Sequence, residues 1–160
     1  MGEQRVVSLK TLSPPARLVE VKPPGEGVVH VFLRFVASEI DCVSGVEAGV
    51  FVVAYDLYYS SRLPDYETEQ LRALFDWFDL NLEYPTRFSR SKRHWGAGKG
   101  VCWFKPTANA HLSKIHEMIF ILENNGVLIR MIKASKVGYV VYEDEHQIVA
   151  EPFSDTSIRR

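Results

Sequence analysis

The side chains best suited to chemistry in this sequence are a group of cations that flank a tryptophan along the chain. Residues 84–116 contain seven lysines and arginines and no aspartate or glutamate, a charge of +7 in a chain whose net charge is −1. Cations neutralise phosphates, aromatic rings stack on bases, and Trp and Arg anchor many protein interfaces. The binding residues that this pattern predicts are Arg87, Arg90, Lys92, Arg93, Trp95 and Lys99.

Three interpretations of this basic segment remain open. The preceding residues 65–83 hold six acids and one arginine. The cations can therefore be solvated or pair with those acids, at about 0–1 kcal/mol per exposed pair. The segment can instead dock a protein partner, or bind nucleic acid or another phosphate-bearing ligand. A pI near 6.5 argues against nucleic acid, because such domains usually carry a basic excess overall.

A second polar group falls in the last third of the chain. Its members are the secondary pocket candidates Arg130, Tyr142, Glu143 and Gln147. They lie in or beside predicted strands, whose alternate side chains project from one face. If they share a face they line a polar pocket that would suit an enzyme. Otherwise Arg130 covers a wet sheet face with its aliphatic stem.

The motifs of common catalytic and cofactor sites fail their spacing tests. Residues 95–100 (WGAGKG) partly match a phosphate-binding loop, but that motif needs Gly at position 93 and Ser or Thr at position 100. This chain has Arg93 and Gly100 there. His111 and His116 are five residues apart, about 140° around a helix, so they do not converge on one metal ion. We expect no cofactor and no metal, and the sequence assigns no catalytic residue.

Length and composition describe one globular domain. The 160 residues are 46% hydrophobic and 24% charged, close to an average domain, which excludes disorder and disulfide-stapled miniproteins. Cys42 and Cys102 form no motif, and we expect two free, buried thiols. No export signal begins the chain and no stretch approaches the about 20 apolar residues of a membrane span. We predict a single cytoplasmic domain, 1–160, with a Pro/Gly-rich arm at 1–27, a long basic loop at 84–100 and a flexible tail at 154–160.

Hydrophobic periodicity predicts the secondary structure. Residues 28–36 alternate as a central strand would. Residues 43–60 have a strand-like composition, but their length favours a buried helix. Asp65 can cap a second, amphipathic helix, and the Asn-Asn-Gly run at 124–126 ends a third, which begins after Thr107. Further strands are expected at 17–22, 101–105, 127–133, 139–142 and 147–150.

These elements predict an α+β domain. The strand at 101–105, the third helix and the strand at 127–133 indicate a parallel pair joined by a right-handed crossover. The last two strands form a C-terminal β-hairpin that extends the sheet in the antiparallel direction. The expected architecture is a mixed sheet with about three helices, mostly on one face.

The aromatic content points to a surface as well as a core. Phe, Trp and Tyr make up 12% of the chain, and Tyr55, Tyr58 and Tyr59 cannot all face inward on one helix. Exposed aromatic rings favour a protein–protein surface, including a homodimer. The sequence therefore favours an interaction or regulatory module that docks a protein partner through the basic segment. The alternatives are nucleic-acid or phosphate binding by that segment, and an enzyme with a polar site on the C-terminal sheet.

Overall fold

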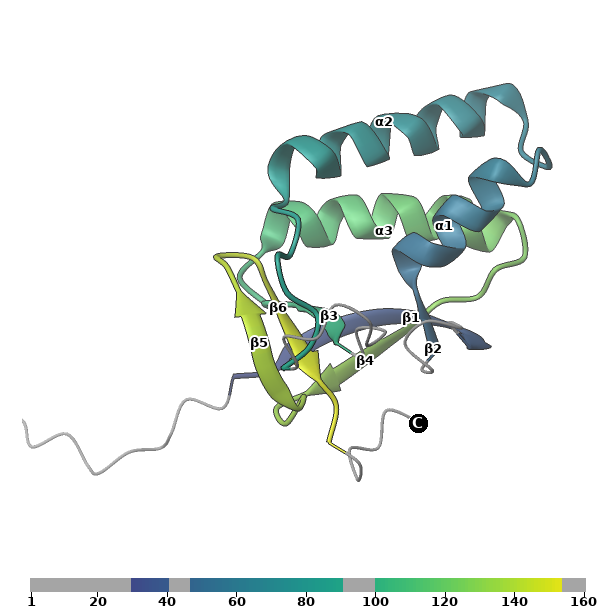
Figure 1. Cartoon of the computed structure of the whole chain (residues 1–160). Coiled ribbons are helices and arrows are strands. Elements are labelled where there is room, and N and C mark those ends of the chain that lie inside the picture. Colours follow the sequence, from purple (N-terminus) through teal and green to yellow (C-terminus); the bar gives the residue numbers. More distant parts are fainter. Residues whose placement is uncertain (1–29, 41–46, 91–99, 154–160) are drawn as a thin grey trace, which may run out of the picture.

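The computed structural model describes residues 30–40, 47–90 and 100–153. Six strands and three helices follow one another along these residues (Figure 1). In chain order they are β1 (Phe32–Ile40), β2 (Glu47–Gly49), α1 (Val50–Tyr59), α2 (Asp65–Asn81), β3 (Val101–Phe104), α3 (Asn109–Asn124), β4 (Arg130–Ala134), β5 (Tyr139–Glu143) and β6 (Gln147–Glu151). The predicted α+β class and the C-terminal hairpin, β5–β6, are confirmed.

Strand β1 lies at the centre of one antiparallel sheet. Along one edge it pairs with β4, and along the other with β3 at Leu33 and with β2 from Val36 onward. β3 pairs in turn with β6, and β6 with β5. The sheet therefore runs β4-β1-β3-β6-β5, with β2 beside the far end of β1. Both faces of β1 carry apolar side chains, as expected of a central strand.

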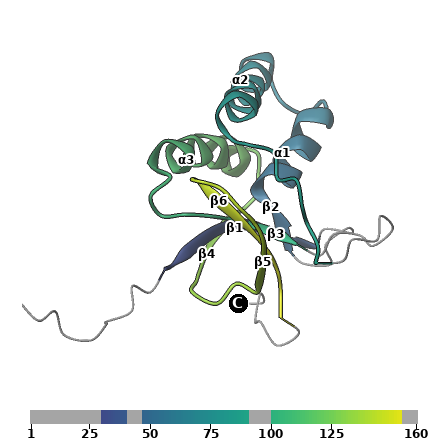
Figure 2. The same ribbon diagram turned by 60° about the vertical axis from the view of Figure 1, so that its left-hand side comes forward.

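The sheet is strongly curled. Its two edge strands, β4 and β5, are joined by only the four residues 135–138, so the sheet has to bend for its edges to come together. Figure 2 shows β4 and the β5–β6 hairpin descending on either side, with this connection closing below them. Gly138 in the connection has φ +122°, and a Cβ there would collide with the carbonyl oxygen of Glu151. Only glycine fits this approach of two backbones.

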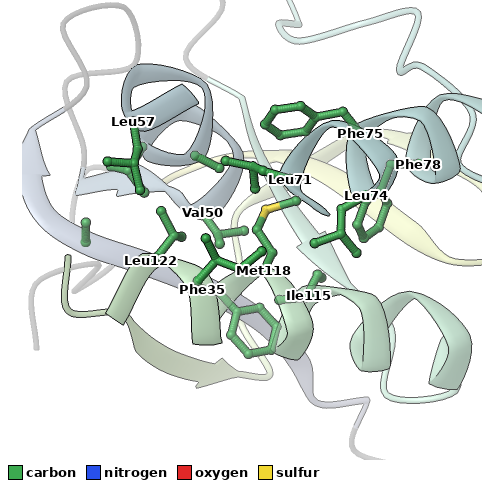
Figure 3. Packing of buried hydrophobic residues seen from close by; sticks show 14 of the residues in the cluster. Phe35, Val50, Leu57, Leu71, Leu74, Phe75, Phe78, Ile115, Met118 and Leu122 are labelled. Carbon is green, nitrogen blue, oxygen red and sulfur yellow. The ribbon is translucent and has the colours of Figure 1, made fainter. Parts of the chain in front are cut away.

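The three helices lie on one side of the sheet. In both views α1 and α3 lie nearer the sheet and α2 lies above them (Figures 1 and 2). Every third or fourth residue of each helix is apolar, and these side chains meet in one core with Phe35 of β1 and Phe104 of β3. Figure 3 shows Met118 of α3 in the middle of this core, with side chains of α2 around it. Met118 and Leu122 are completely buried.

A second apolar cluster fills the opposite, inner face of the curled sheet. It consists of Val101, Trp103, Val137, Ile148 and Ala150, with Phe32 and Ile132 packed against them. Side chains of β3 alternate between the two clusters, since Phe104 faces the helices and Trp103 faces inward. Both faces of β3 therefore pack against apolar side chains, which explains why residues 101–104 (VCWF) form a continuous apolar run.

One topological prediction is wrong. Residues 101–105 and 127–133 do contain strands joined by a helix, but β1 lies between β3 and β4 and pairs antiparallel with both. The sheet is antiparallel in all its described pairings, and not mixed. A crossover helix fixes the direction of the strands it joins, whereas it leaves open whether an earlier strand is inserted between them.

Two local predictions need smaller corrections. The segment 43–60 is helical only from Val50, because β2 precedes α1. Its buried residues nevertheless follow the predicted helical spacing through Val53, Ala54 and Leu57. Helix α2 has Pro64 and not Asp65 as its N-cap, and Asp65 is the first helical residue, where the helix dipole favours a carboxylate.

Several predictions concern positions outside the described residues. These are the arm at 1–27, the strand at 17–22, the tail at 154–160 and the thiol of Cys42. Within the described residues, no helix is both long and apolar enough to cross a membrane.

Candidate functional site: an aromatic pocket beside an acidic cavity

The predicted basic site is described only at its first two cations. Arg87 donates from Nε to the carbonyl of Ser89 (2.8 Å) and from Nη2 to that of Arg90 (2.7 Å). Arg90 holds the Glu151 carboxylate with its backbone N–H (3.1 Å) and its Nε (3.4 Å), and lies 3.9 Å from the ring centre of Tyr139. Arg90 thus fastens the segment 84–90 to the edge of the sheet, whereas Arg87 braces the segment from within. Lys92, Arg93, Trp95 and Lys99 lie outside the described residues.

The secondary pocket candidates separate into three places. Tyr142 and Gln147 converge on the carboxylate of Asp144, at 3.1 Å and 3.0 Å. Glu143 instead forms an ion pair with Lys105 (2.7 Å). Arg130 pairs with Glu47 of β2 (2.5 Å), at the other end of the sheet. Tyr142 and Gln147 therefore share a polar cluster, to which sequence reasoning did not assign Asp144, and Arg130 has no part in it.

Asp144 organises the turn between β5 and β6. One carboxylate oxygen accepts the backbone N–H groups of His146 (2.7 Å) and Gln147 (2.8 Å). Although partial burial opposes it, these hydrogen bonds lower the pKa of Asp144. Partial burial, together with hydrogen bonds to Asp144 and Glu83, raises the pKa of Tyr142 to about 12. The cluster is thus internally satisfied, with an ionised Asp144 and a neutral Tyr142 at neutral pH.

His111 ties the end of α2 to this turn. The ring is almost fully buried, its Nε2 lies 2.8 Å from the carbonyl oxygen of Asn81, and its centre is 4.1 Å from that of His146. His116, by contrast, is exposed and bonds the carbonyl of Leu112 within its own helix. Among the described residues, no group of three His, Cys, Asp or Glu side chains could hold a metal ion. His111 serves packing at this point.

A pocket of about 240 Å³ opens between α1, α2, β3 and the segment that follows α2. Its walls are mostly aromatic, and its polar groups are few. The lining residues include Phe51 and Tyr55 of α1, Phe75, Phe78 and Asp79 of α2, Glu83, Tyr84 and Phe88 of the following segment, Cys102 and Phe104 of β3, and Gln147 of β6. We call this cavity the aromatic pocket. Largely apolar walls with a few polar groups are typical of binding sites.

The thiol of Cys102 lies at the aromatic pocket and at a further cavity of about 190 Å³ on the β2 side. Burial raises the pKa of this thiol to about 11, so it is neutral at physiological pH and is a poor nucleophile. The predicted free thiol is confirmed for Cys102, which is half-buried and not fully enclosed.

A polar cavity of about 410 Å³ adjoins the aromatic pocket. The two share Asp79, Leu82, Glu83 and Tyr84, and the polar cavity adds residues at the end of α2 and in the β5–β6 turn: Leu80, Asn81, Asp144, Glu145 and His146. We call it the acidic cavity, because its described lining has four carboxylates and no Lys or Arg.

Large apolar side chains are exposed around these cavities. Leu80 and Tyr84 are 85% and 83% exposed, and Tyr59, stacked beside Tyr55, is 74% exposed. The prediction that the tyrosines of α1 cannot all be buried is confirmed. Partial burial, and the nearby carboxylate of Asp79, raise the pKa of Tyr55. We call Tyr55, Tyr59, Leu80 and Tyr84 the apolar rim.

A groove of about 690 Å³ between α2 and α3 is the main alternative site. It contains Trp77 and the exposed Phe120, but its other walls are mixed, and Lys114 and Glu117 form an ion pair beside them (2.9 Å). Lys114, Glu117 and His116 find their partners within α3, and no feature of the groove indicates what would fill it.

The aromatic pocket was missed in the sequence because its walls come from four separated stretches of the chain. One local signal was present: aromatic and acidic residues alternate closely from Phe75 to Tyr84. In the sequence alone, their spacing indicates the buried stripe of a helix, and the acids among them can equally pair with the basic segment. The chain matches no known family model, no curated protein and no solved structure.

Proposed function

We propose that this protein is a small interaction module, in which the aromatic pocket receives an apolar side chain of a partner protein. The observation that carries the proposal is an aromatic pocket whose walls include the exposed rings of Tyr55 and Tyr84. The exposed Tyr59 stacks beside Tyr55, and the exposed Leu80 lines the adjoining acidic cavity. In protein interfaces, a few anchor side chains packed in water-free pockets supply most of the binding energy.

The exposed rim favours a protein over a small molecule as the ligand. The aromatic pocket alone would hold a compact group, but Leu80, Tyr84 and Tyr59 extend the apolar surface beyond its walls. Exposed apolar side chains gathered beside a pocket are typical of interaction sites on proteins. A second copy of this chain would be one such partner. The mass of the protein in solution shows whether it forms that dimer.

The basic segment contributes to the proposed site by holding one wall of the aromatic pocket in place. Arg90 fastens the segment that carries Tyr84 and Phe88 to β6 and β5. Arg87 braces the same segment from within. Four further residues of the basic segment, which lie outside the described residues, stay predicted contacts of the partner: Lys92, Arg93, Trp95 and Lys99. With both described arginines engaged inside the chain, nucleic-acid binding is the weaker alternative. The predicted cytoplasmic location stays part of the proposal.

Selection from a random peptide library displayed on phage tests this function. We expect the enriched peptides to share a large apolar or aromatic side chain at one position. Cys102→Leu fills the pocket from its floor and should abolish binding of these peptides, whereas Cys102→Ser, of nearly unchanged size, should bind them normally. A lack of enrichment, or equal binding to both variants, would contradict the proposal.

A further inference from the structure

The walls of the site have a strong charge asymmetry. Asp79 and Glu83 line both the aromatic pocket and the acidic cavity, and Asp144 and Glu145 complete the acidic cavity. Among the described residues, no Lys or Arg lines either cavity, and none of these four carboxylates forms an ion pair. Residues 65–83 as a whole contribute a charge of −5.

Lys105, a described cation beside the β5–β6 turn, is already engaged. Lys105 donates from Nζ to the backbone carbonyl of Asp144 (2.6 Å) and pairs with Glu143 (2.7 Å). Asp144 itself receives hydrogen bonds from Tyr142, His146 and Gln147, so it is stabilised as an anion without a cation. Asp79 and Glu83 thus present their negative charge to whatever enters the site.

We infer that the partner segment carries a Lys or Arg next to its apolar anchor, and that this cation enters the acidic cavity while the anchor enters the aromatic pocket. The inference rests on the proposed function and specifies its partner. Carboxylates lining a cleft with low-dielectric walls concentrate the negative potential there. The ring of Tyr84, which lines both cavities, adds a cation–π attraction to an ammonium or guanidinium group.

The cost of removing water from carboxylates gives a reason for the acidic cavity to adjoin the aromatic pocket. An apolar side chain alone would cover the mouth of the aromatic pocket and take water away from Asp79 and Glu83. Removing water from a carboxylate without supplying a partner for it is costly. A cation beside the anchor compensates that cost, so the same residues select against neutral and acidic neighbours of the anchor.

The peptide selection separates this inference from the function on which it rests. On the wild-type protein we expect an apolar anchor with Lys or Arg within two positions of it. On the double variant Asp79→Asn, Glu83→Gln we expect the apolar anchor without the basic preference. Both substitutions keep size and hydrogen-bonding groups, and thermal unfolding confirms that the variant is folded.

Affinities of one synthetic enriched peptide complete the test. Replacing its Lys or Arg with norleucine should weaken binding to the wild-type protein about tenfold at low salt, and should change binding to the double variant less than twofold. Enrichment of an apolar anchor with no basic neighbour, or an equal loss in both proteins, would overturn the inference and leave the proposed function standing. Absence of any enriched anchor would overturn both.

Discussion

The β5–β6 turn and the aromatic pocket lie side by side and differ in how completely their chemical groups are satisfied. At the turn, the Asp144 carboxylate accepts hydrogen bonds from the Tyr142 hydroxyl and from the side-chain amide of Gln147. Around the pocket, Leu80, Tyr84 and Tyr59 remain more than 70% exposed, and Asp79 has no ion pair among the described residues. Polar groups that satisfy one another stabilise the fold, whereas groups left without partners indicate a binding surface.

Substitution of Gly138 should have the largest effect on the scaffold side of this comparison. Gly138→Ala places a Cβ against the carbonyl oxygen of Glu151 at a positive φ, so we expect a loss of about 3 kcal/mol or more in the free energy of unfolding. Gly126→Ala is the matched control, because Gly126 also has a positive φ but open space around its Cα. It should cost about 1 kcal/mol. Urea denaturation measures both, and equal losses would show that the backbone contact at Gly138 does not matter.

The thiol at the pocket should react slowly. In a Cys42→Ser background, the pKa of about 11 for Cys102 leaves about 100-fold less thiolate at pH 8 than a thiol of pKa 9 would have. Alkylation by iodoacetamide, followed by mass spectrometry, should therefore accelerate with pH up to about pH 11. Urea-unfolded protein is the control, and it should react rapidly at pH 8. Rapid reaction of the folded protein at that pH would mean that the pocket floor is more open to water than described here.

Loss of the Asp144 carboxylate should have an intermediate, pH-dependent effect. Asp144→Ala removes the acceptor of two backbone N–H groups and of the Gln147 amide, and should cost about 1–3 kcal/mol at pH 7. The folded state lowers the pKa of Asp144, so its contribution is present above the unfolded pKa near 4 and is lost as the pH falls through the folded value. The stability difference from wild type should shrink between pH 5 and pH 2. A constant difference would exclude the charge as its source.

The apolar rim should contribute least to stability. Leu80→Ser and Tyr84→Ser change side chains that are more than 80% exposed, so the free energy of unfolding should stay within about 0.5 kcal/mol of wild type. Phe120→Ser, at an exposed position on the α2–α3 groove, serves as the matched control. The two rim variants should weaken binding of an enriched peptide at least tenfold, and the control should not. A large loss of stability in the rim variants would mean that the rim is structural.

Much of the fold was predictable because it follows local patterns. The apolar spacing of Leu71, Leu74, Phe75 and Phe78 defines one face of α2, and the Asn-Asn-Gly run ends α3 at Asn124, with Gly126 at φ +82°. The insertion of β1 between β3 and β4 was not predictable in this way. It depends on pairing between strands that are some 70 and 100 residues apart, and neither strand's own sequence specifies its neighbour.

The candidate site was less predictable than the fold. Sequence reasoning singled out Tyr142 and Gln147, which do meet, but grouped them with Arg130, whose partner Glu47 lies on β2. One of the three open interpretations pairs the acids of 65–83 with the basic segment, yet Asp79 and Glu83 line cavities that have no Lys or Arg among the described residues. A charge count along the chain does not reveal which charges are paired, because pairing is set by tertiary distances.

The site of docking can be measured directly by NMR with ¹⁵N-labelled protein and an enriched, Lys- or Arg-containing peptide. If the peptide docks at the aromatic pocket and the acidic cavity, the largest backbone shift changes will fall on α1 near Tyr55, on residues 79–88 and on β3 near Cys102. Shift changes centred instead on the α2–α3 groove around Trp77 and Phe120 would contradict this docking site.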